Sequence, residues 1–141
     1  MIRIVADTNV LVSACIGRGP SSTVIEACLD GRFVPNISGP LLLEYRDVLG
    51  RTEPFLRSRL TTEERWTLLE IFVSRCHWRT VYFKWRPNLQ DEGDNHLLEL
   101  AVAANAHIVV TSNIRDFDSA ELKFPHIKIE RPATAVRRLL P

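Results

Sequence analysis

Residues 2–9 read Ile-Arg-Ile-Val-Ala-Asp-Thr-Asn, a short run of β-forming residues that ends on a carboxylate at Asp7. The β-branched positions favour a strand, and the alanine is small enough for a crowded sheet centre. The carboxyl ends of strands in an open α/β sheet are where ligands bind. Thr8 and Asn9 are short polar residues that suit a tight turn. Two interpretations of Asp7 follow, as a turn-forming residue or as part of a binding site.

Segments typical of strands and helices alternate along the rest of the chain, without repeats or an obvious linker. Further strands are predicted at residues 33–37, 78–83, 108–111 and 127–129. Helices are predicted to begin near residues 21, 38, 61, 94 and 132, each at a capping residue, an acidic first turn or a proline. Strands separated by helices indicate βαβ units, so we expect one α/β domain over residues 1–141 with a mainly parallel sheet.

The clearest amphipathic helix carries Trp66, Leu69, Phe72 and Val73 on one face. The segment 112–117, which follows a buried strand, is predicted as a loop.

The composition limits the class of protein. A chain of 141 residues with 45% hydrophobic and 25% charged residues is typical of one globular domain with a real core. No apolar run approaches the ~20 residues of a membrane span, and no signal pattern opens the chain, so we expect a cytoplasmic protein. The three cysteines are widely spaced, which predicts buried thiols and neither disulfides nor a zinc site.

The net charge of +1 does not by itself indicate a nucleic-acid partner. The basic residues are concentrated, however: residues 46–86 contain nine Arg or Lys against five Asp or Glu. Arginines can bind phosphates through bidentate contacts. A solvated helical surface explains most of them equally well.

Four acidic residues occupy positions where they can meet. Asp7 ends the first strand, Asp94 lies in the first turn of a helix, and Asp116 follows a buried strand. Strand carboxyl ends and the following helix N-termini share one edge of a parallel sheet, so these three are predicted at the same rim. Glu44 stands inside an apolar helical stretch and would approach from a helix face.

Carboxylates crowded together repel, and their pKa values rise unless a cation neutralises them. Oxygen ligands of this kind suit Mg²⁺ or Mn²⁺. Two such ions ~3.5–4 Å apart would activate water and stabilise the leaving oxygen of a phosphodiester. The four histidines lack the spacing of zinc ligands.

Each acid also has an ordinary interpretation. Asp94 is a common first-turn helix acid, and Asp116 can cap a helical turn around residues 119–122. Glu44 can lie at the solvent boundary of its helix. A binding site is favoured because all four acids are predicted at the same edge of the sheet.

Four segments follow one another in a characteristic order. They are Asp-Thr-Asn-Val-Leu-Val-Ser-Ala at residues 7–14, the internal Glu44, Asp-Asn-His-Leu-Leu-Glu-Leu-Ala at 94–101, and Thr-Ser-Asn at 111–113 with Asp116-Phe117. From Ile2 to about Phe117 the chain thereby resembles a PIN domain, most closely the toxin type of VapC-like ribonucleases from toxin–antitoxin pairs.

The resemblance implies a three-layer α/β/α sandwich and a metal-dependent endoribonuclease acting on single-stranded RNA. Asp7, Glu44, Asp94 and Asp116 would be the catalytic carboxylates, with Asp7, Asp94 and Asp116 as ligands of Mg²⁺ or Mn²⁺. The supporting residues would donate hydrogen bonds to ligands or bound water. These are Thr8, Asn9, Thr111, Ser112 and Asn113.

Water activated at the metal would attack the RNA phosphorus in line and leave a 3′-hydroxyl and a 5′-phosphate. Many relatives have an aspartate where this chain has Asn113, so the second metal is expected to bind weakly here. Asp91, Glu92 and Glu99 could partly substitute, although Glu99 is expected to face solvent.

The resemblance also implies a cognate antitoxin, whose C-terminal segment would cover the acidic site, and a possible homodimer. Trp66 and Trp78 are candidates for such a surface, whereas Phe72 is expected in the core. Alternative functions are a non-enzymatic RNA-binding module and a Mg²⁺-dependent phosphohydrolase. The phosphohydrolase would require a second aspartate at position 9, where this chain has Asn9. Glycine-rich nucleotide-binding loops are absent.

Overall fold

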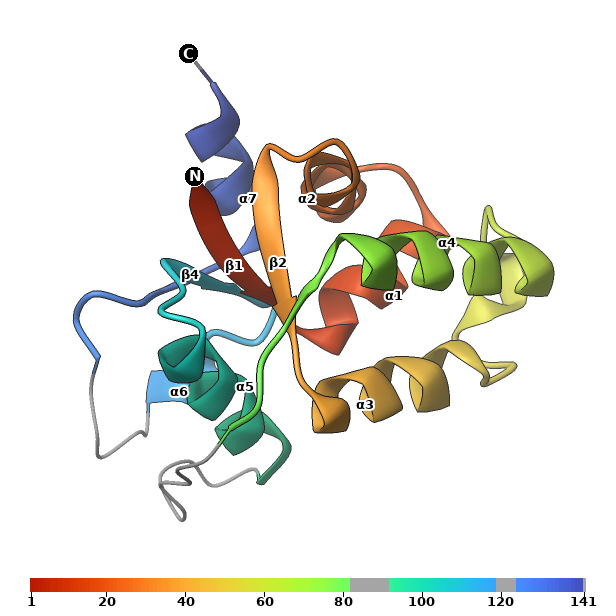
Figure 1. Cartoon of the computed structure of the whole chain (residues 1–141). Helices are drawn as coiled ribbons and strands as arrows, with labels where there is room; N and C mark the ends of the chain where they lie inside the picture. The colour runs from red at the N-terminus through yellow and green to blue at the C-terminus, as the bar shows by residue number, and fades with distance from the viewer. Residues whose placement is uncertain (82–91, 119–123, 141) are drawn as a thin grey trace.

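A parallel sheet forms the centre of the molecule (Figure 1). The computed structural model describes residues 1–81, 92–118 and 124–140, without the side chains of residues 92–94, 116 and 118. The strands are β1 (Ile2–Ala6), β2 (Phe33–Ile37), β3 (His77–Trp78), β4 (Ile108–Val110) and β5 (Lys128–Glu130). Their order is β3-β2-β1-β4-β5, and every neighbouring pair is parallel.

Helices cover both faces of this sheet, which confirms the predicted three-layer α/β/α architecture. They are α1 (Thr8–Ile16), α2 (Pro20–Leu29), α3 (Gly39–Leu49), α4 (Thr62–Arg75), α5 (Glu92–Ala103), α6 (Arg115–Asp118) and α7 (Pro132–Val136), with short 3-10 helices η1 (Phe55–Arg57) and η2 (Arg137–Leu139). In Figure 1, α1, α2 and α4 lie on one side of the sheet and α5 on the other. Among the described residues, none of the helices has the length and apolar character needed to cross a membrane.

The two central strands are apolar because helices cover them on both faces. Ile4, Val5 and Ala6 of β1 and all of β4 are buried. Around them pack Val10 and Leu11 of α1 and the apolar residues of α2, α3 and α5. Burial of this kind contributes roughly 25 cal/mol for each Å² of apolar surface removed from water. The core therefore holds the carboxyl ends of β1 and β4 rigidly side by side.

The first difference from the sequence-based prediction lies directly after β1. A tight turn was expected at Thr8 and Asn9, but α1 begins at Thr8, and Asp7 is its N-cap. The Asp7 carboxylate accepts a hydrogen bond from the Thr8 backbone N–H at 2.7 Å. Aspartate is among the residues favoured at N-caps. The signal that the turn prediction overlooked is the helical spacing of the apolar residues in α1, of which Val10 and Ala14 are buried.

Several other boundaries shift. The strand predicted at 78–83 is only His77–Trp78 among the described residues, and its second half lies outside them. The loop predicted at 112–117 contains the start of α6 at Arg115. Helix α2 begins at Pro20 with Gly19 as its cap, where Ser21 or Ser22 was expected, and Ser22 accepts a hydrogen bond from the Gly19 N–H.

The buried face of α4 includes a residue that the predicted stripe left out. Leu69 and Phe72 are buried, but Trp66 remains 36% exposed. The third buried position is Arg65, whose guanidinium lies 4.1 Å from the centroid of the Phe55 ring and donates to the Leu49 carbonyl. Helical spacing identifies the stripe, but it cannot show that an arginine with a long apolar stem takes part in it.

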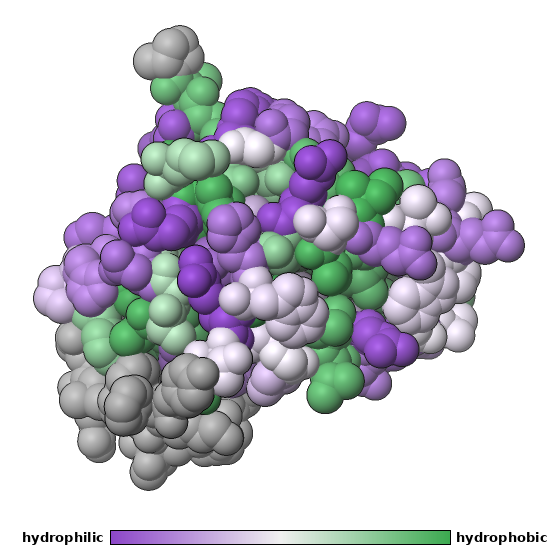
Figure 2. Space-filling view, in the orientation of Figure 1, coloured by the Kyte–Doolittle hydropathy of each residue, from purple (hydrophilic) through white to green (hydrophobic). Residues whose placement is uncertain are grey.

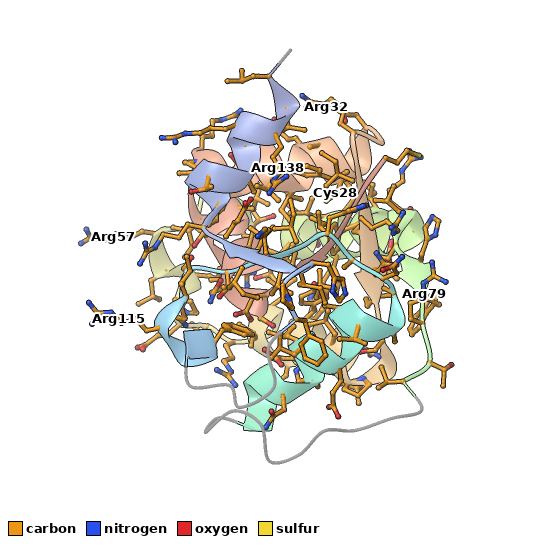
Figure 3. All side chains as sticks on the ribbon, turned by 90° about the vertical axis from the view of Figure 1, so that its left-hand side faces the viewer. Cys28, Arg32, Arg57, Arg79, Arg115 and Arg138 are labelled. Carbon is orange, nitrogen blue, oxygen red and sulfur yellow. The ribbon has the colours of Figure 1, made fainter. Side chains whose placement is uncertain are left out.

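The cysteines agree with the prediction of unpaired buried thiols. Cys15 and Cys28 are buried and Cys76 is half-buried, and all three are free. Cys28 lies in the interior of the molecule in Figure 3.

Candidate metal and catalytic site

The candidate site lies where the strand order changes direction. From β1 the chain adds β2 and β3 on one side, then crosses to β4 and β5 on the other. The crevice outside the carboxyl ends of the strands at such a switch point is where open α/β sheets bind ligands. The Asp7 N–H donates to the Val110 carbonyl at 2.9 Å, which ties the two strand ends together. Asp7 and Thr111 therefore meet at this crevice.

Asp7 is 6% exposed, and both of its carboxylate oxygens accept hydrogen bonds. Oδ1 accepts from the Thr8 N–H, while Oδ2 accepts from the Thr111 hydroxyl at 2.8 Å and the Asn9 side-chain amide at 3.2 Å. A carboxylate offers about four lone-pair positions. Within the described part of the chain, Oδ1 is thus the oxygen that can still take a ligand.

Burial raises the pKa of the Asp7 carboxyl, and the hydrogen bonds from Thr111 and Thr8 only partly oppose this effect. The nearby charge of Glu44 raises it further. Among the residues that the structure describes, no lysine or arginine pairs with Asp7 or Glu44. A cation bound here would lower the free energy of the ionised form.

The predicted supporting residues surround Asp7. The Thr111 hydroxyl accepts hydrogen bonds from the Asn113 N–H at 3.0 Å and the Asn9 amide at 3.4 Å, and the Asn9 side-chain oxygen accepts from the Ser112 N–H at 3.1 Å. Ser112 and Asn113 contribute to this network through their backbones, and both residues are exposed. Their proximity to Asp7 is therefore observed, whereas a role toward a metal stays a prediction.

Glu44 reaches the same place from α3. Its Oε1 accepts from the Thr8 hydroxyl at 2.5 Å, and its Oε2 pairs with Nε2 of His96 at 2.7 Å. The hydrogen bond from His96 lowers the pKa of Glu44 most, and the one from Thr8 adds to it, while burial opposes both. Glu44 is thus ionised at neutral pH.

Helix α3 is held in register with β1 by the residue next to Glu44. Ser38 caps the helix and accepts a hydrogen bond from the Leu41 N–H. The fully buried Tyr45 donates its hydroxyl to the carbonyl of Ala6, the last residue of β1. Tyr45 therefore fixes the distance between α3 and the strand end that carries Asp7.

Thr8 connects the two carboxylates directly. Its backbone N–H binds Asp7 and its hydroxyl binds Glu44. Two carboxylates without a lysine or arginine partner in the described structure fit the preference of Mg²⁺ and Mn²⁺ for oxygen ligands. Among the described side chains, no three His, Cys, Asp or Glu residues form a metal-binding group, so further ligands are needed.

The two remaining predicted carboxylates lie in described helices, but their side chains are outside the described residues. Asp94 is in the first turn of α5, two residues before His96, whose side chain contacts Glu44. Asp116 is the second residue of α6, which follows the end of β4. The backbone thus places both near this edge of the sheet, and their approach to Asp7 stays a prediction. Asp91 lies outside the described residues.

One prediction about the acids is wrong. Glu99 was expected to face solvent, but it is 3% exposed. Every residue from Leu97 to Ala101 is buried. Helix α5 is covered on more than one face because it packs against both the sheet and α3. A single apolar stripe therefore underestimated how much of it is buried.

His96 is the contact that sequence reasoning missed. Its distance of 52 residues from Glu44 gives no local signal, and scattered histidines were judged only for zinc spacing. Its position two residues after Asp94 was the available hint.

A concave surface of different composition lies away from these carboxylates. A groove of about 600 Å³ between α3 and α4 is lined by Leu42, Arg46, Trp66, Leu69, Glu70, Val73 and Ser74. Figure 2 shows hydrophobic surface in this region. None of the predicted site residues lines the groove, so it is separate from the candidate site.

The fold and the site define a three-layer α/β protein with an acidic centre at the carboxyl edge of a parallel sheet. Residues 3–115 match the family model of the PIN domain. The chain belongs to the PIN domain family, as its sequence motifs predicted. Members of this family are generally metal-dependent nucleases.

A solved structure with a similar fold is VapBC2 from Rickettsia felis bound to a DNA fragment from its promoter. The TM-score is 0.61 at 19% sequence identity, and the match covers 92% of this chain and 98% of the other. At that identity the likeness supports the fold alone. The chain has no match among curated proteins.

Proposed function

We propose that this protein is a Mg²⁺- or Mn²⁺-dependent endoribonuclease that cleaves single-stranded RNA, and that it is the toxin of a toxin–antitoxin pair. The observation that supports this most is the pair of carboxylates, Asp7 and Glu44, joined through Thr8 at the switch point of the sheet. Neither pairs with a lysine or arginine among the described residues. Membership in the PIN family supplies the reaction class.

The residues that would hold the metal are Asp7, through Oδ1, with Asp94 and Asp116. A divalent ion bound there would lower the pKa of a coordinated water and offset charge on the phosphate. Thr111 and Asn9 keep the other oxygen of Asp7 occupied, so the carboxylate presents one defined atom. Glu44 is held ionised beside it and can accept a proton or orient a water.

RNA would be bound through its phosphates. Exposed arginines are available, among them Arg57 and Arg115, which both project from the surface in Figure 3. Contacts of this kind, from the arginines of residues 46–86 above all, would make binding salt-dependent. The contacts would be to the backbone of RNA and thus largely independent of its sequence.

Cleavage of a labelled single-stranded RNA panel tests this proposal. Wild type should cleave with Mg²⁺ or Mn²⁺ and lose activity in EDTA, and Asp7→Asn should be inactive under all conditions. Asp47→Asn is a matched control. Asp47 lies in the last turn of α3, is exposed, and pairs with Arg51 just beyond the helix. Equal cleavage by wild type and Asp7→Asn, or cleavage in EDTA, would contradict the assignment.

The partner in the proposal is a cognate antitoxin. The structural neighbour from Rickettsia felis is a toxin–antitoxin complex on promoter DNA, which favours the same arrangement here. We also propose that the protein acts in the cytoplasm, where RNA is available, and that it can form a homodimer. Co-expression with a short adjacent reading frame should relieve growth arrest, and the two products should purify together.

The alternative is a PIN-like module that binds RNA without cleaving it. The neutral Asn113, at a position where many relatives have an acid, favours this candidate because it removes one charge from the site. Mn²⁺ titration by calorimetry decides between the two: absence of binding at neutral pH favours the module. A phosphohydrolase is less consistent, since the side chain of Asn9 is engaged with Asp7 and Thr111.

A further inference from the structure

We propose that His96 is a positioning residue that holds the Glu44 carboxylate in its working orientation, an inference that rests on the proposed nuclease function. Glu44 has a long side chain that samples several rotamers when it is unconstrained. Here both of its oxygens accept hydrogen bonds, Oε1 from the Thr8 hydroxyl and Oε2 from His96 Nε2. The two partners come from α1 and α5, so the carboxylate plane is set by separate elements.

This arrangement leaves the Glu44 carboxylate with free positions to accept further hydrogen bonds or bind an ion. A carboxylate has about two lone-pair positions on each oxygen, and Thr8 and His96 occupy one on each. One position per oxygen therefore stays open toward a water or an ion. The side chain of Glu44 is about one-third exposed, so these positions can be reached from solvent.

Only one of the two ring nitrogens of His96 makes a hydrogen bond in the described structure. An ionised carboxylate accepts but does not donate, so Nε2 of His96 carries the hydrogen that it shares with Glu44. The His96 side chain is 11% exposed, and its Nδ1 is buried without a hydrogen-bond partner among the described residues. Buried polar atoms are normally paired. The ring is thus oriented by its bond to Glu44, and its other nitrogen makes no matching contact.

Helix α5 does not need this bond to stay in place. Leu97, Leu100 and Ala101 are almost completely buried against the sheet. Their burial anchors the helix, and a histidine that faces a partly exposed carboxylate adds little to it. We therefore expect His96 to affect the reaction far more than the stability.

The test compares His96→Leu, which removes the donor, with His96→Gln, whose side-chain amide can donate in its place. His77→Leu is the matched control, because His77 is exposed on β3 and contacts none of the site residues in the described structure. We would measure kcat and KM on a labelled RNA oligomer, Mn²⁺ affinity by calorimetry, and Tm for each variant. Loss of an orienting partner of this kind commonly costs about 10–100-fold in activity or metal affinity.

His96→Leu should lose about 10–100-fold in kcat or Mn²⁺ affinity, with KM for RNA and Tm close to wild type. His96→Gln and His77→Leu should stay within about threefold of wild type. Because His96 acts through Glu44, the pair Glu44→Gln and His96→Leu should be no worse than Glu44→Gln alone.

Full activity of His96→Leu, or an equal further loss in the Glu44→Gln background, would overturn the positioning role while leaving the nuclease function intact. A wild type that neither cleaves RNA nor binds Mn²⁺ would overturn the proposed function, and the positioning role with it. A loss in His96→Gln as large as that in His96→Leu would overturn the role as a hydrogen-bond donor, because the amide can donate and leucine cannot.

Discussion

The Thr111 hydroxyl donates to Asp7 Oδ2 at 2.8 Å, although 104 residues separate the two in the chain. The contact exists because β4 pairs directly with β1, with Val110 opposite Ala6. The same hydroxyl accepts two hydrogen bonds, from the Asn113 N–H and the Asn9 amide. One donor and two acceptor positions are all that a hydroxyl has. Thr111 is therefore the hub of the network that orients Asp7.

Thr111→Val keeps the shape of the side chain and removes this hub. Asp7 would lose its shortest side-chain hydrogen bond, and its Oδ1 would no longer be presented in one orientation. We expect Mn²⁺ affinity or cleavage to fall by about 10–100-fold. Thr111→Ser retains the hydroxyl and should stay near wild type in calorimetry and in the cleavage assay. Unchanged metal binding by Thr111→Val would show that the hydroxyl does not matter to the site.

The raised pKa of Asp7 predicts a pH-dependent stability of the metal-free protein. Because the folded-state pKa lies above the ordinary value of 3.8, the folded protein holds this proton more tightly than the unfolded chain. Stability contributed by Asp7 is therefore fully present below that value and is lost as pH rises through the folded-state pKa. We expect the stability of wild type relative to Asp7→Asn to decline as the pH rises above about 4.

Urea unfolding of both proteins in EDTA, followed by circular dichroism, measures this difference. The comparison with Asp7→Asn removes the contributions of other groups, including the opposite effect of Glu44. A difference that stays constant, or that grows in favour of wild type with rising pH, would contradict the burial argument. Added Mn²⁺ should stabilise wild type but not the variant.

Tyr45→Phe should destabilise the protein by about 1–3 kcal/mol, because it leaves the buried Ala6 carbonyl without its side-chain partner. The ring still fits, and its edge-on contact with Phe72, 5.8 Å between centroids, is retained. The measurement is the free energy of unfolding from urea titration at neutral pH. A loss below about 0.5 kcal/mol would indicate that water replaces the hydroxyl.

The three thiols should be unreactive in the folded protein. Burial raises the pKa of Cys15 to about 11 and that of Cys76 to about 12, and it raises the pKa of Cys28 still further. The thiolate is the reactive form, so almost none is present at pH 8. With a coloured disulfide reagent we expect no fast reaction in buffer and three equivalents in guanidinium chloride. A thiol that reacts within seconds in buffer would show local opening around it.

Local patterns were sufficient for much of the fold. The β-forming run before Asp7, the capping residues Ser38 and Thr61, and the prolines at 40 and 132 each predicted an element that the structure contains. They succeed because caps and hydrophobic periodicity act within a few residues. The helix after Asp7 was missed because a short polar pair resembles a turn, although the apolar residues behind it repeat with helical spacing.

The candidate site was only partly visible from the sequence. Asp7 and Glu44 are brought together as predicted, with Thr8 and Thr111 in contact with them. The approach of Asp94 and Asp116 stays a prediction. The burial of Glu99 and the buried stacking of Arg65 went undetected, because each depends on which surfaces of its helix another element covers.

By itself, the sequence determined the class of fold and indicated the candidate acids, because strand and helix signals and the position of Asp7 at a strand end are local properties. Only the tertiary structure decided which strands are neighbours and therefore which side chains meet. Pairing of β1 with β4 brings Thr111 to Asp7, and packing of α5 near α3 brings His96 to Glu44. Such contacts join residues 52 to 104 positions apart, and their geometry is set by core packing that no local pattern records.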